Sequence, residues 1–363
     1  MIIKSSPFSQ LRTWVKTHKK EASAIAAGFL VVIAGVTTYA LLQKPEESPK
    51  KSTVKKPEQK PAPKPITYYS PLTGEVIDSE AGQTAPTTAI MIENSPDARP
   101  QSGLKDAGIV YEAIAEGGIT RFLAIYQNKK PGLIGPVRSL RMYYVDWLAP
   151  YNASIAHVGG SQNALNEVRN GSYRDIDQFF NAGTYWRASD RYAPHNVYTS
   201  FENIDALNAA KGYTSSTFTG FPRQDGTPAT EVTAGTINVN FSGPLYNTAY
   251  TYDRENNRYN RQLGGVAHTD REAGQISPSV VVALRVTMQR VLEDGYREQV
   301  GTIGSGTAVL FQNGTAQEIT WQKADRASPL KLLAADGSEI PLNRGQTWIA
   351  AVPTTGGGIS WQP

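Results

Sequence analysis

The stretch that decides the fold is residues 139–169, which read SLRMYYVDWLAPYNASIAHVGGSQNALNEVR. Residues 139–148 are typical of a helix, and residues 153–160 are typical of a strand that ends at two glycines. Ser161 then stands at the N-cap position of a second helix, which we expect to continue to Arg169. This alternation of helix and strand predicts an α/β or α+β domain.

Strands are also predicted on the N-terminal side of this stretch. TTAIMIEN (87–94) reads as a buried strand that leads into a loop. IVYEAIAEGG (109–118) and TRFLAIYQN (120–128) are apolar, β-branched runs separated by Gly117 and Gly118. Two such runs with a glycine pair between them predict adjacent strands joined by a tight turn.

The C-terminal part has a different pattern, and we expect a mainly β domain there. QNG (312–314) and ADG (335–337) are hairpin signals. We place the first domain at residues 68–225 and the second at residues 226–363. The strands predicted in the second domain are 236–243, 247–262, 279–289, 306–314, 317–324 and 342–353.

Composition narrows the possible classes of protein. The chain has 363 residues and no cysteine, which excludes disulfides, thiolate metal sites and a cysteine nucleophile. The net charge is +4, and the basic excess is confined to residues 1–64. A nucleic-acid-binding module would carry a basic face on its folded part, so we expect no nucleic-acid partner.

The N-terminal region predicts a membrane anchor. Residues 1–21 are basic, and residues 22–42 contain no charged side chain. A helix of 21 residues is about 30 Å long, which matches the bilayer core. The alternative is a cleaved signal peptide, but its apolar run is usually shorter and is followed by a cleavage site. We therefore expect a retained single transmembrane helix after a cytoplasmic tail, with the ectodomain outside the membrane.

Residues 43–67 predict a disordered spacer between the helix and the folded part. They alternate Pro with Lys and Glu and contain nothing that could form a core. Binding of nucleic acid is the alternative function for these lysines, but the segment has no arginine and adjoins the predicted anchor.

Arg138 and Arg141 are the first candidate ligand-binding residues. A spacing of three places both on one face of a helix, where they would repel each other unless an anion lies between them. One alternative is an internal ion pair with Asp146, Glu112 or Glu116. The other is a clamp for a carboxylate or phosphate ligand.

A second candidate is the turn at Gly159, Gly160 and Ser161. It lies between a strand and a helix start, where free backbone N–H groups and the helix dipole favour an anion. His157 precedes this turn and is a candidate catalytic residue. Because it alternates with apolar residues, it is equally compatible with a core histidine.

The third candidate is the polar loop SDRYAPHN (189–196). It carries Asp190 and His195 as candidate catalytic residues and Arg191 and Asn196 as candidate ligand-binding residues. A loop that is held together by bonds to its own backbone is the alternative interpretation.

His268 and Asp270 lie in the second predicted domain and are candidates to complete a ligand site between the domains. A simple turn is the alternative. No histidine or aspartate pair has a recognised metal spacing, so we predict no metal ligand and no cofactor. Ser161 with His195 and an aspartate could imitate a serine hydrolase, but the GxSxG motif is absent.

Several of these motifs resemble one known family. AIMIENSPDARPQSGL, IGPVRSLRMYYVDW, AHVGGSQNAL and SDRYAPHNVYTS are similar to the DUF3048 family of bacterial envelope proteins. The C-terminal part, with Tyr252, Gly265, His268, Asp270 and GQTWIAAVP, resembles the family's second domain. The resemblance implies a membrane-tethered extracytoplasmic protein of unknown activity. Lipoprotein members carry a lipidated cysteine, so here the helix would provide the anchor.

Three functions are compatible with these residues. The first is a binding protein that holds an anionic wall component, or an envelope protein partner, in a cleft of arginine and histidine side chains. The second is a hydrolase or transferase acting on wall glycan or peptide, with His195 or His157 as general base oriented by Asp190. The third is a scaffold without a small ligand.

Overall fold

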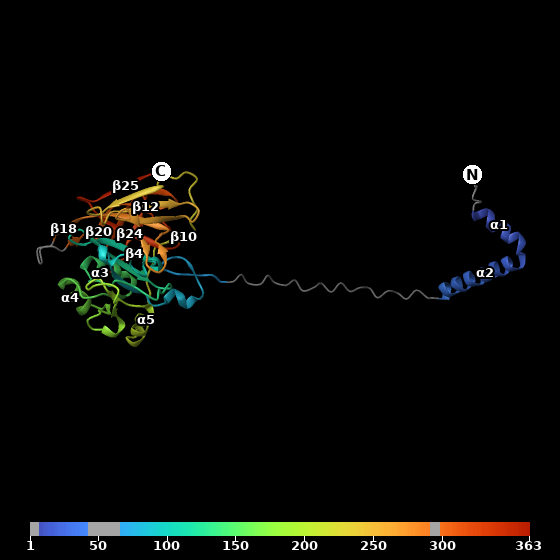
Figure 1. The fold of residues 1–363 in the computed structure, drawn as a ribbon, viewed down its shortest axis with the longest axis horizontal. Coiled ribbons are helices and arrows are strands. Elements are labelled where there is room, and N and C mark those ends of the chain that lie inside the picture. The colour runs from blue at the N-terminus through green and yellow to red at the C-terminus, as the bar shows by residue number, and fades with distance from the viewer. Residues whose placement is uncertain (1–6, 43–65, 291–297) are drawn as a thin grey trace. The chain divides into compact units, whose positions relative to one another are not determined.

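The chain was studied as a computed structural model that describes residues 7–42, 66–290 and 298–363. It divides into two compact units, Met1–Lys64 and Pro65–Pro363 (Figure 1). Each unit is considered by itself below.

The N-terminal unit contains two helices, α1 (Pro7–Thr17) and α2 (Lys19–Leu42). Residues 19–39 have a mean hydropathy of 1.8, and by length and composition this segment can cross a membrane. It overlaps the apolar segment expected at residues 22–42. The spacer expected at residues 43–67 lies outside the described residues, apart from its last two positions.

The second unit is built on a ten-stranded mixed sheet. Five of its strands come from the N-terminal half of the unit and five from the C-terminal half, and β24 and β4 join the halves as parallel neighbours. In sheet order the strands are β22 (Lys331–Leu333), β21 (Thr315–Lys323), β20 (Gly304–Gln312), β17 (Val280–Val286), β24 (Thr347–Pro353), β4 (Ile109–Glu116), β5 (Ile119–Tyr126), β3 (Thr88–Glu93), β6 (Ser154–Ala156) and β7 (Arg174–Asp175).

A second, five-stranded sheet is entirely antiparallel. Its outer strand comes from the C-terminus of the chain, which returns to pair with β11. In sheet order the strands are β14 (Val266–Ala267), β13 (Arg258–Leu263), β12 (Thr248–Asp253), β11 (Thr236–Asn240) and β25 (Gly358–Gln362).

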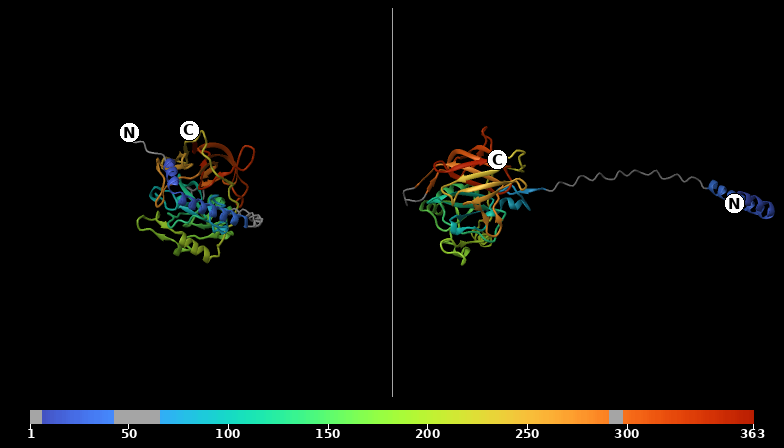
Figure 2. Two further views of the ribbon diagram at one scale, coloured as in Figure 1. Left: turned by 90° about the vertical axis from the view of Figure 1, so that its right-hand side faces the viewer. Right: turned by 45° about the horizontal axis from the view of Figure 1, so that its top comes forward.

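The large sheet is covered on both faces. Ile90 and Phe122 point to the face where they join a core with Ile237 and Tyr250 of the five-stranded sheet. The alternate residues form a second core on the other face, against the helices α3 (Met142–Leu148) and α4 (Gln162–Asn170). Figure 1 and Figure 2 show the C-terminal strands, yellow to red, stacked over the green N-terminal part. Burial on both faces explains why the central strands are mostly apolar rather than alternating.

Shorter elements connect these layers. The helix α5 (Phe201–Ala210) is capped by Ser200, whose Oγ accepts a hydrogen bond from the Asn203 N–H. Two-stranded pairs are formed by β1 (Tyr68–Tyr69) with β2 (Val76–Ile77), β8 (Trp186–Arg187) with β9 (Val197–Tyr198), β10 (Arg223–Gln224) with β23 (Leu342–Asn343), β15 (Thr269–Asp270) with β16 (Gly274–Gln275), and β18 (Met288–Arg290) with β19 (Glu298–Val300). The 3-10 helices are η1 (Glu80–Thr84), η2 (Pro96–Ala98), η3 (Leu104–Asp106), η4 (Ala149–Tyr151) and η5 (Ala182–Thr184).

The predicted hairpin at Gly117 and Gly118 is confirmed, because β4 pairs with β5 and both glycines have positive φ. Four details of the predicted elements were wrong. The segment 279–289, expected as one strand, contains β17 and the start of β18. Residues 139–141 are not helical, and α3 begins only at Met142. The segment 247–262 forms two strands with a turn at Asn257 rather than one strand. The segment 342–353 likewise contains both β23 and β24.

The fold is thus a mixed α/β structure with one large mixed sheet and one antiparallel sheet. Because the large sheet uses strands from both halves, no break in the sheet marks the boundary at 225/226. That boundary stays a prediction.

A buried lysine near the end of β21 gives the first testable expectation. Lys323 Nζ donates to the carbonyls of Arg326 and Ser328, and its burial lowers the pKa from 10.5 to about 8. Between these two values the unfolded chain binds more protons than the folded one, so this group makes stability rise with pH. We expect the stability of the wild type relative to Lys323→Met to increase from pH ~7 to ~9.5. Urea unfolding of both proteins at the two pH values measures the difference.

Lys331→Met is the control, because the Lys331 side chain is 46% exposed. The difference in unfolding free energy between Lys331→Met and the wild type should not depend on pH over the same range. A pH-independent difference for Lys323→Met would contradict the expectation.

Candidate functional site

The candidate site is centred on a histidine held by a buried carboxylate. Glu93 is the last residue of β3, and its side chain is only 4% exposed. His195, from the loop between β8 and β9, places Nδ1 2.8 Å from Glu93 Oε1, and Ser95 Oγ donates to the same oxygen at 2.8 Å. Because an ionised carboxylate can only accept, Nδ1 donates this bond. In the neutral ring Nε2 therefore carries the lone pair.

Arg138 completes the surroundings of Glu93. Its Nε lies 3.3 Å from Glu93 Oε1, and its side chain is 26% exposed. Glu93 Oε2 is buried, and within the described residues it has no hydrogen-bond partner. A carboxylate so placed orients the imidazole and stabilises positive charge on it.

His195 Nε2 lies on a groove of about 690 Å³. Its nearest charged neighbour is Asp97 Oδ2 at 3.9 Å, and the Asp97 side chain is 82% exposed. Arg99 also lines the groove. On the rim, Arg271 donates to Asp190 Oδ2 at 2.6 Å. The groove thus joins loops from both halves of the unit.

Arg99 is anchored under the groove by the backbone and side chain of Asn94. Its NH2 group donates to Asn94 O at 2.9 Å and its Nε to Asn94 Oδ1 at 3.1 Å, while NH1 has no partner among the described residues. Burial lowers the pKa of Arg99, although Tyr246 and Glu112 oppose this effect. A partly desolvated guanidinium with a free N–H group can bind an entering anion.

Beneath the groove lies an ion pair that is fully buried between the two sheets. Arg261 of β13 donates to Glu112 Oε2 of β4 at 2.7 Å, and both side chains are 0% exposed. Trp348 Nε1 and Thr120 Oγ1 donate to the same carboxylate at 2.9 and 3.0 Å. The carboxylate of Glu112 is therefore fully satisfied.

His268 belongs to this buried network. Nδ1 contacts Arg261 NH1, and Nε2 lies 2.9 Å from Gln101 Oε1. Burial, with the charges of Arg261 and Arg99, holds the pKa of His268 well below its usual range. Asp270 accepts the backbone N–H groups of Lys105 and of two residues in its own turn. Neither residue lines the groove, and both join the halves of the unit.

Arg141 does not form a pair with Arg138. Both its Nε and NH2 donate to Glu116 Oε2. The other oxygen of this carboxylate, Oε1, accepts a hydrogen bond from Arg121 NH2. Burial would raise the pKa of Glu116, but Arg121 and Arg141 outweigh it and lower the pKa. The expected helical face with both arginines does not exist, because Arg141 has extended backbone and precedes α3.

The turn expected to bind an anion is already occupied by the protein's own groups. Gly159 N–H donates to Asp177 Oδ1 at 3.0 Å, and Ser161 N–H donates to Leu140 O. A Cβ on Gly160 would lie 3.0 Å from the same Leu140 oxygen, which explains the second glycine. An external ligand would have to displace the Asp177 carboxylate.

His157 is a fully buried structural residue in this arrangement. Its Nε2 lies 2.9 Å from Asp175 Oδ1 and its Nδ1 2.8 Å from Gly159 O. The bond to His157 lowers the pKa of Asp175 against the opposing effect of burial. No ring nitrogen remains for a substrate.

The remaining candidates of the 189–196 loop support the loop itself. Asn196 accepts from Arg187 NH1 at 2.8 Å and donates to Ala188 O and Arg191 O. Arg191 donates to the carbonyls of Asp97 and Pro100. These bonds fix the loop that carries His195 against the loop after β3.

The comparisons with known proteins give the family. The models for the N-terminal and C-terminal domains of "Protein of unknown function (DUF3048)" match residues 72–214 and 237–349. The chain belongs to the DUF3048 family. It is 34% identical over 289 residues to "Putative lipoprotein YerB" of Bacillus subtilis (strain 168), covering 78% of this chain and 86% of the relative.

A solved relative supports the same assignment. The crystal structure of YerB protein from Bacillus subtilis matches with a TM-score of 0.72 and 31% identity, covering 81% of this chain and 99% of that chain. The predicted resemblance is therefore confirmed. The apolar N-terminal helix and the relationship to a protein named as a lipoprotein support membrane association.

Sequence reasoning missed Glu93, Ser95 and Arg99 as site residues. Glu93 was included in a buried strand, and Ser95 and Arg99 in the loop that follows it. A signal was present, because an acidic residue that ends an apolar strand and enters a polar loop is typical of a functional position.

Proposed function

We propose that this protein is a single-pass, membrane-anchored envelope protein whose ectodomain binds an anionic group of a wall component in the groove beside His195. The observation that carries the proposal is the free Nε2 of a histidine whose Nδ1 is held by Glu93. Arg99 lines the same groove, and Arg138 lies beside the histidine's carboxylate partner. Arg99 would supply a charge-assisted hydrogen bond to phosphate or carboxylate oxygens, and His195 would donate a second one whenever Nε2 carries a proton.

The proposed site contains fewer residues than the cleft expected from the sequence. Arg141, Arg191, Asn196 and the turn at Gly159 are bound to the protein's own groups. A scaffold without a ligand would have no pocket beside its polar cluster. The groove of about 690 Å³ next to His195 therefore favours binding over the scaffold.

Retention of the ectodomain on phosphate-rich wall polymer tests the proposal. Arg99→Gln and His195→Gln should each weaken binding about 10-fold, because each removes a groove side chain that can donate a hydrogen bond to the anion. Binding of the wild type should also fall as salt rises, since part of it is electrostatic.

Arg254→Gln is the matched control, because Arg254 lies away from the groove and donates only a long bond to Thr230 O at 3.4 Å. It should bind like the wild type. Binding that ignores salt, or that is unchanged in both groove variants, would refute the anion site.

An enzyme is the second candidate, and the Glu93–His195 pair favours it. Nε2 of an imidazole oriented by a buried carboxylate can take a proton from a water or hydroxyl nucleophile. Arg99 and Arg138 could then stabilise negative charge on the attacked group. The reaction would be hydrolysis or transfer on wall glycan or peptide.

A further inference from the structure

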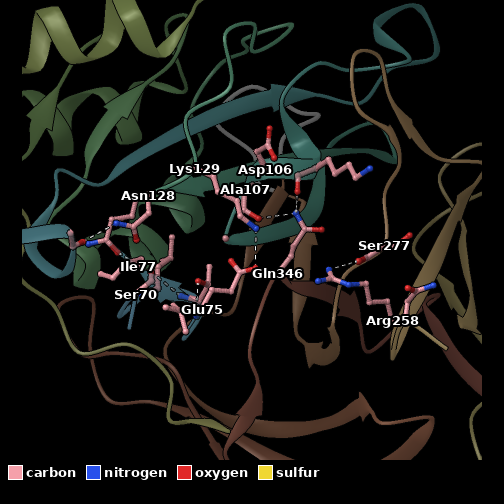
Figure 3. A pocket seen from close by; sticks show the side chains of 18 of the residues that line it. Ser70, Glu75, Ile77, Asp106, Ala107, Asn128, Lys129, Arg258, Ser277 and Gln346 are labelled. Carbon is pink, nitrogen blue, oxygen red and sulfur yellow. Dashed lines mark hydrogen bonds and ion pairs between the residues drawn. The ribbon is translucent and has the colours of Figure 1, made fainter. Parts of the chain in front are cut away.

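A second cavity, of about 790 Å³, lies elsewhere on the same unit and shares no lining residue with the groove. One wall is formed by the β1–β2 segment and the end of β5, and another by β13 and the residues near Ser277. Figure 3 shows Glu75 and Asn128 on one side of the cavity and Arg258 and Ser277 on the opposite side. Like the groove, the cavity is built from both family-matched segments.

The cavity presents polar groups that the protein leaves unused. Asp106 is half-buried, and its carboxylate forms no hydrogen bond or ion pair with the residues described. Burial raises its pKa, and the charge of Asp270 adds to this effect. A half-desolvated carboxylate without a partner gains from a donor supplied by a ligand.

Two amide side chains on the other walls are fixed by hydrogen bonds through one atom of the amide group, and the other atom stays available. Gln346 Nε2 donates to Leu104 O and Ala107 O, both at 2.8 Å, which leaves Oε1 as an acceptor. Asn260 accepts from Ser277 Oγ at 2.6 Å through Oδ1, which leaves Nδ2 as a donor. Such pre-fixed amides recognise a ligand at a small entropic cost.

The charges of the cavity differ from those of the groove. Lys129 is paired with Glu75 at 2.9 Å, and Lys105 Nζ donates to Ala273 O at 2.6 Å. Its walls carry four acidic side chains and three basic ones, so it does not select an anion. The lining residues include no aromatic ring. The chemistry that matches alternating donors and acceptors without net charge is that of hydroxyl and amide groups.

We propose that this cavity binds a neutral, hydroxyl- and amide-bearing glycan segment, independently of the groove. Asp106 and Gln346 accept from sugar hydroxyls, and Asn260 donates to a hydroxyl or acetamido oxygen. A wall strand bound here and an anionic group bound in the groove would attach the ectodomain at two points, which raises the avidity.

The probe is a soluble tetramer of N-acetylglucosamine, which carries hydroxyls and amides but no charge. It is titrated into the full-length protein in detergent, and binding is followed by isothermal calorimetry. We expect saturable binding with a dissociation constant of about 1 mM, because polar contacts without aromatic stacking give modest affinity. Asp106→Ala and Asn260→Ala should each weaken it about 10-fold.

Arg138→Ala, which removes the arginine beside Glu93, should bind the tetramer like the wild type. Since the probe has no anionic group, failure of the groove proposal leaves this result unchanged, and the reverse also holds. Absence of saturation up to about 10 mM would overturn the proposal. So would binding that survives both cavity variants, or binding that is lost in Arg138→Ala.

Discussion

Arg261→Met should lower the free energy of unfolding of the ectodomain by about 3–5 kcal/mol. The substitution leaves the Glu112 carboxylate buried between two sheets without its charged partner, at 0% exposure. It also removes the cation that stacks over the Trp348 ring, 4.3 Å from its centroid. A buried charge that loses its partner is far more costly than a lost surface pair. Urea unfolding of residues 66–363, followed by tryptophan fluorescence, measures the change.

Two comparisons make this result decisive. Lys130→Met breaks a pair with Asp205 whose side chains are 33% and 38% exposed, so it should cost about 1 kcal/mol or less. The double variant Arg261→Met with Glu112→Gln should recover part of the loss, because the unpaired charge is gone. A loss below about 1 kcal/mol for Arg261→Met alone would show that the pair is hydrated or dispensable.

The strands of the large sheet could be predicted because both of its faces are covered. Mostly apolar runs such as residues 109–116 are typical of strands buried on both faces, and the glycine pair between β4 and β5 sets the hairpin. The order of the strands could not be predicted. Pairing of β24 with β4 joins residues about 240 positions apart, and no local pattern encodes that contact.

Polar residues in strands were the main source of error in the second half. Residues 247–262 were predicted as one strand, although the wholly polar run DRENNR (253–258) interrupts the aromatic residues at the turn that Asn257 forms. Arg261 was not singled out in the sequence, and His268 was a candidate to complete a ligand site, with a simple turn as the alternative. Only the facing sheet, with Glu112, explains why they are buried.

The sequence predicted His195 as a candidate site residue but not the side chains that contact it. Asp190 was expected to orient the general base, His195 or His157, and instead it accepts a hydrogen bond from Arg271. The carboxylate that does contact His195 is Glu93, 102 positions earlier. Likewise the turn at Gly159 looked open because Asp177, which fills it, comes 18 residues later. A sequence shows neighbours along the chain, whereas these bonds depend on neighbours across the fold.

The contact between Glu93 and His195 gives the largest expected effect on activity. If the groove catalyses hydrolysis or transfer on wall material, His195→Ala should reduce product release by about 10²–10⁴-fold, the usual contribution of a general base. Glu93→Gln should cause a large loss as well, because a neutral amide no longer fixes Nδ1–H or stabilises the imidazolium. Mass spectrometry of the soluble products formed from fractionated wall by residues 66–363 measures both.

Asp190→Asn tests whether Glu93, which contacts His195 in the structure, or Asp190, which the sequence analysis favoured, orients the histidine. Its partner Arg271 is on the rim, so we expect a loss of less than about 10-fold, well below that of Glu93→Gln. Asp205→Asn, on α5 and away from the groove, should leave the rate unchanged. Equal losses in the Asp190 and Glu93 variants would reject Glu93 as the orienting carboxylate. Full product release by His195→Ala would reject the enzyme hypothesis. Salt-sensitive retention on wall material without products would support the groove as a binding site for an anion.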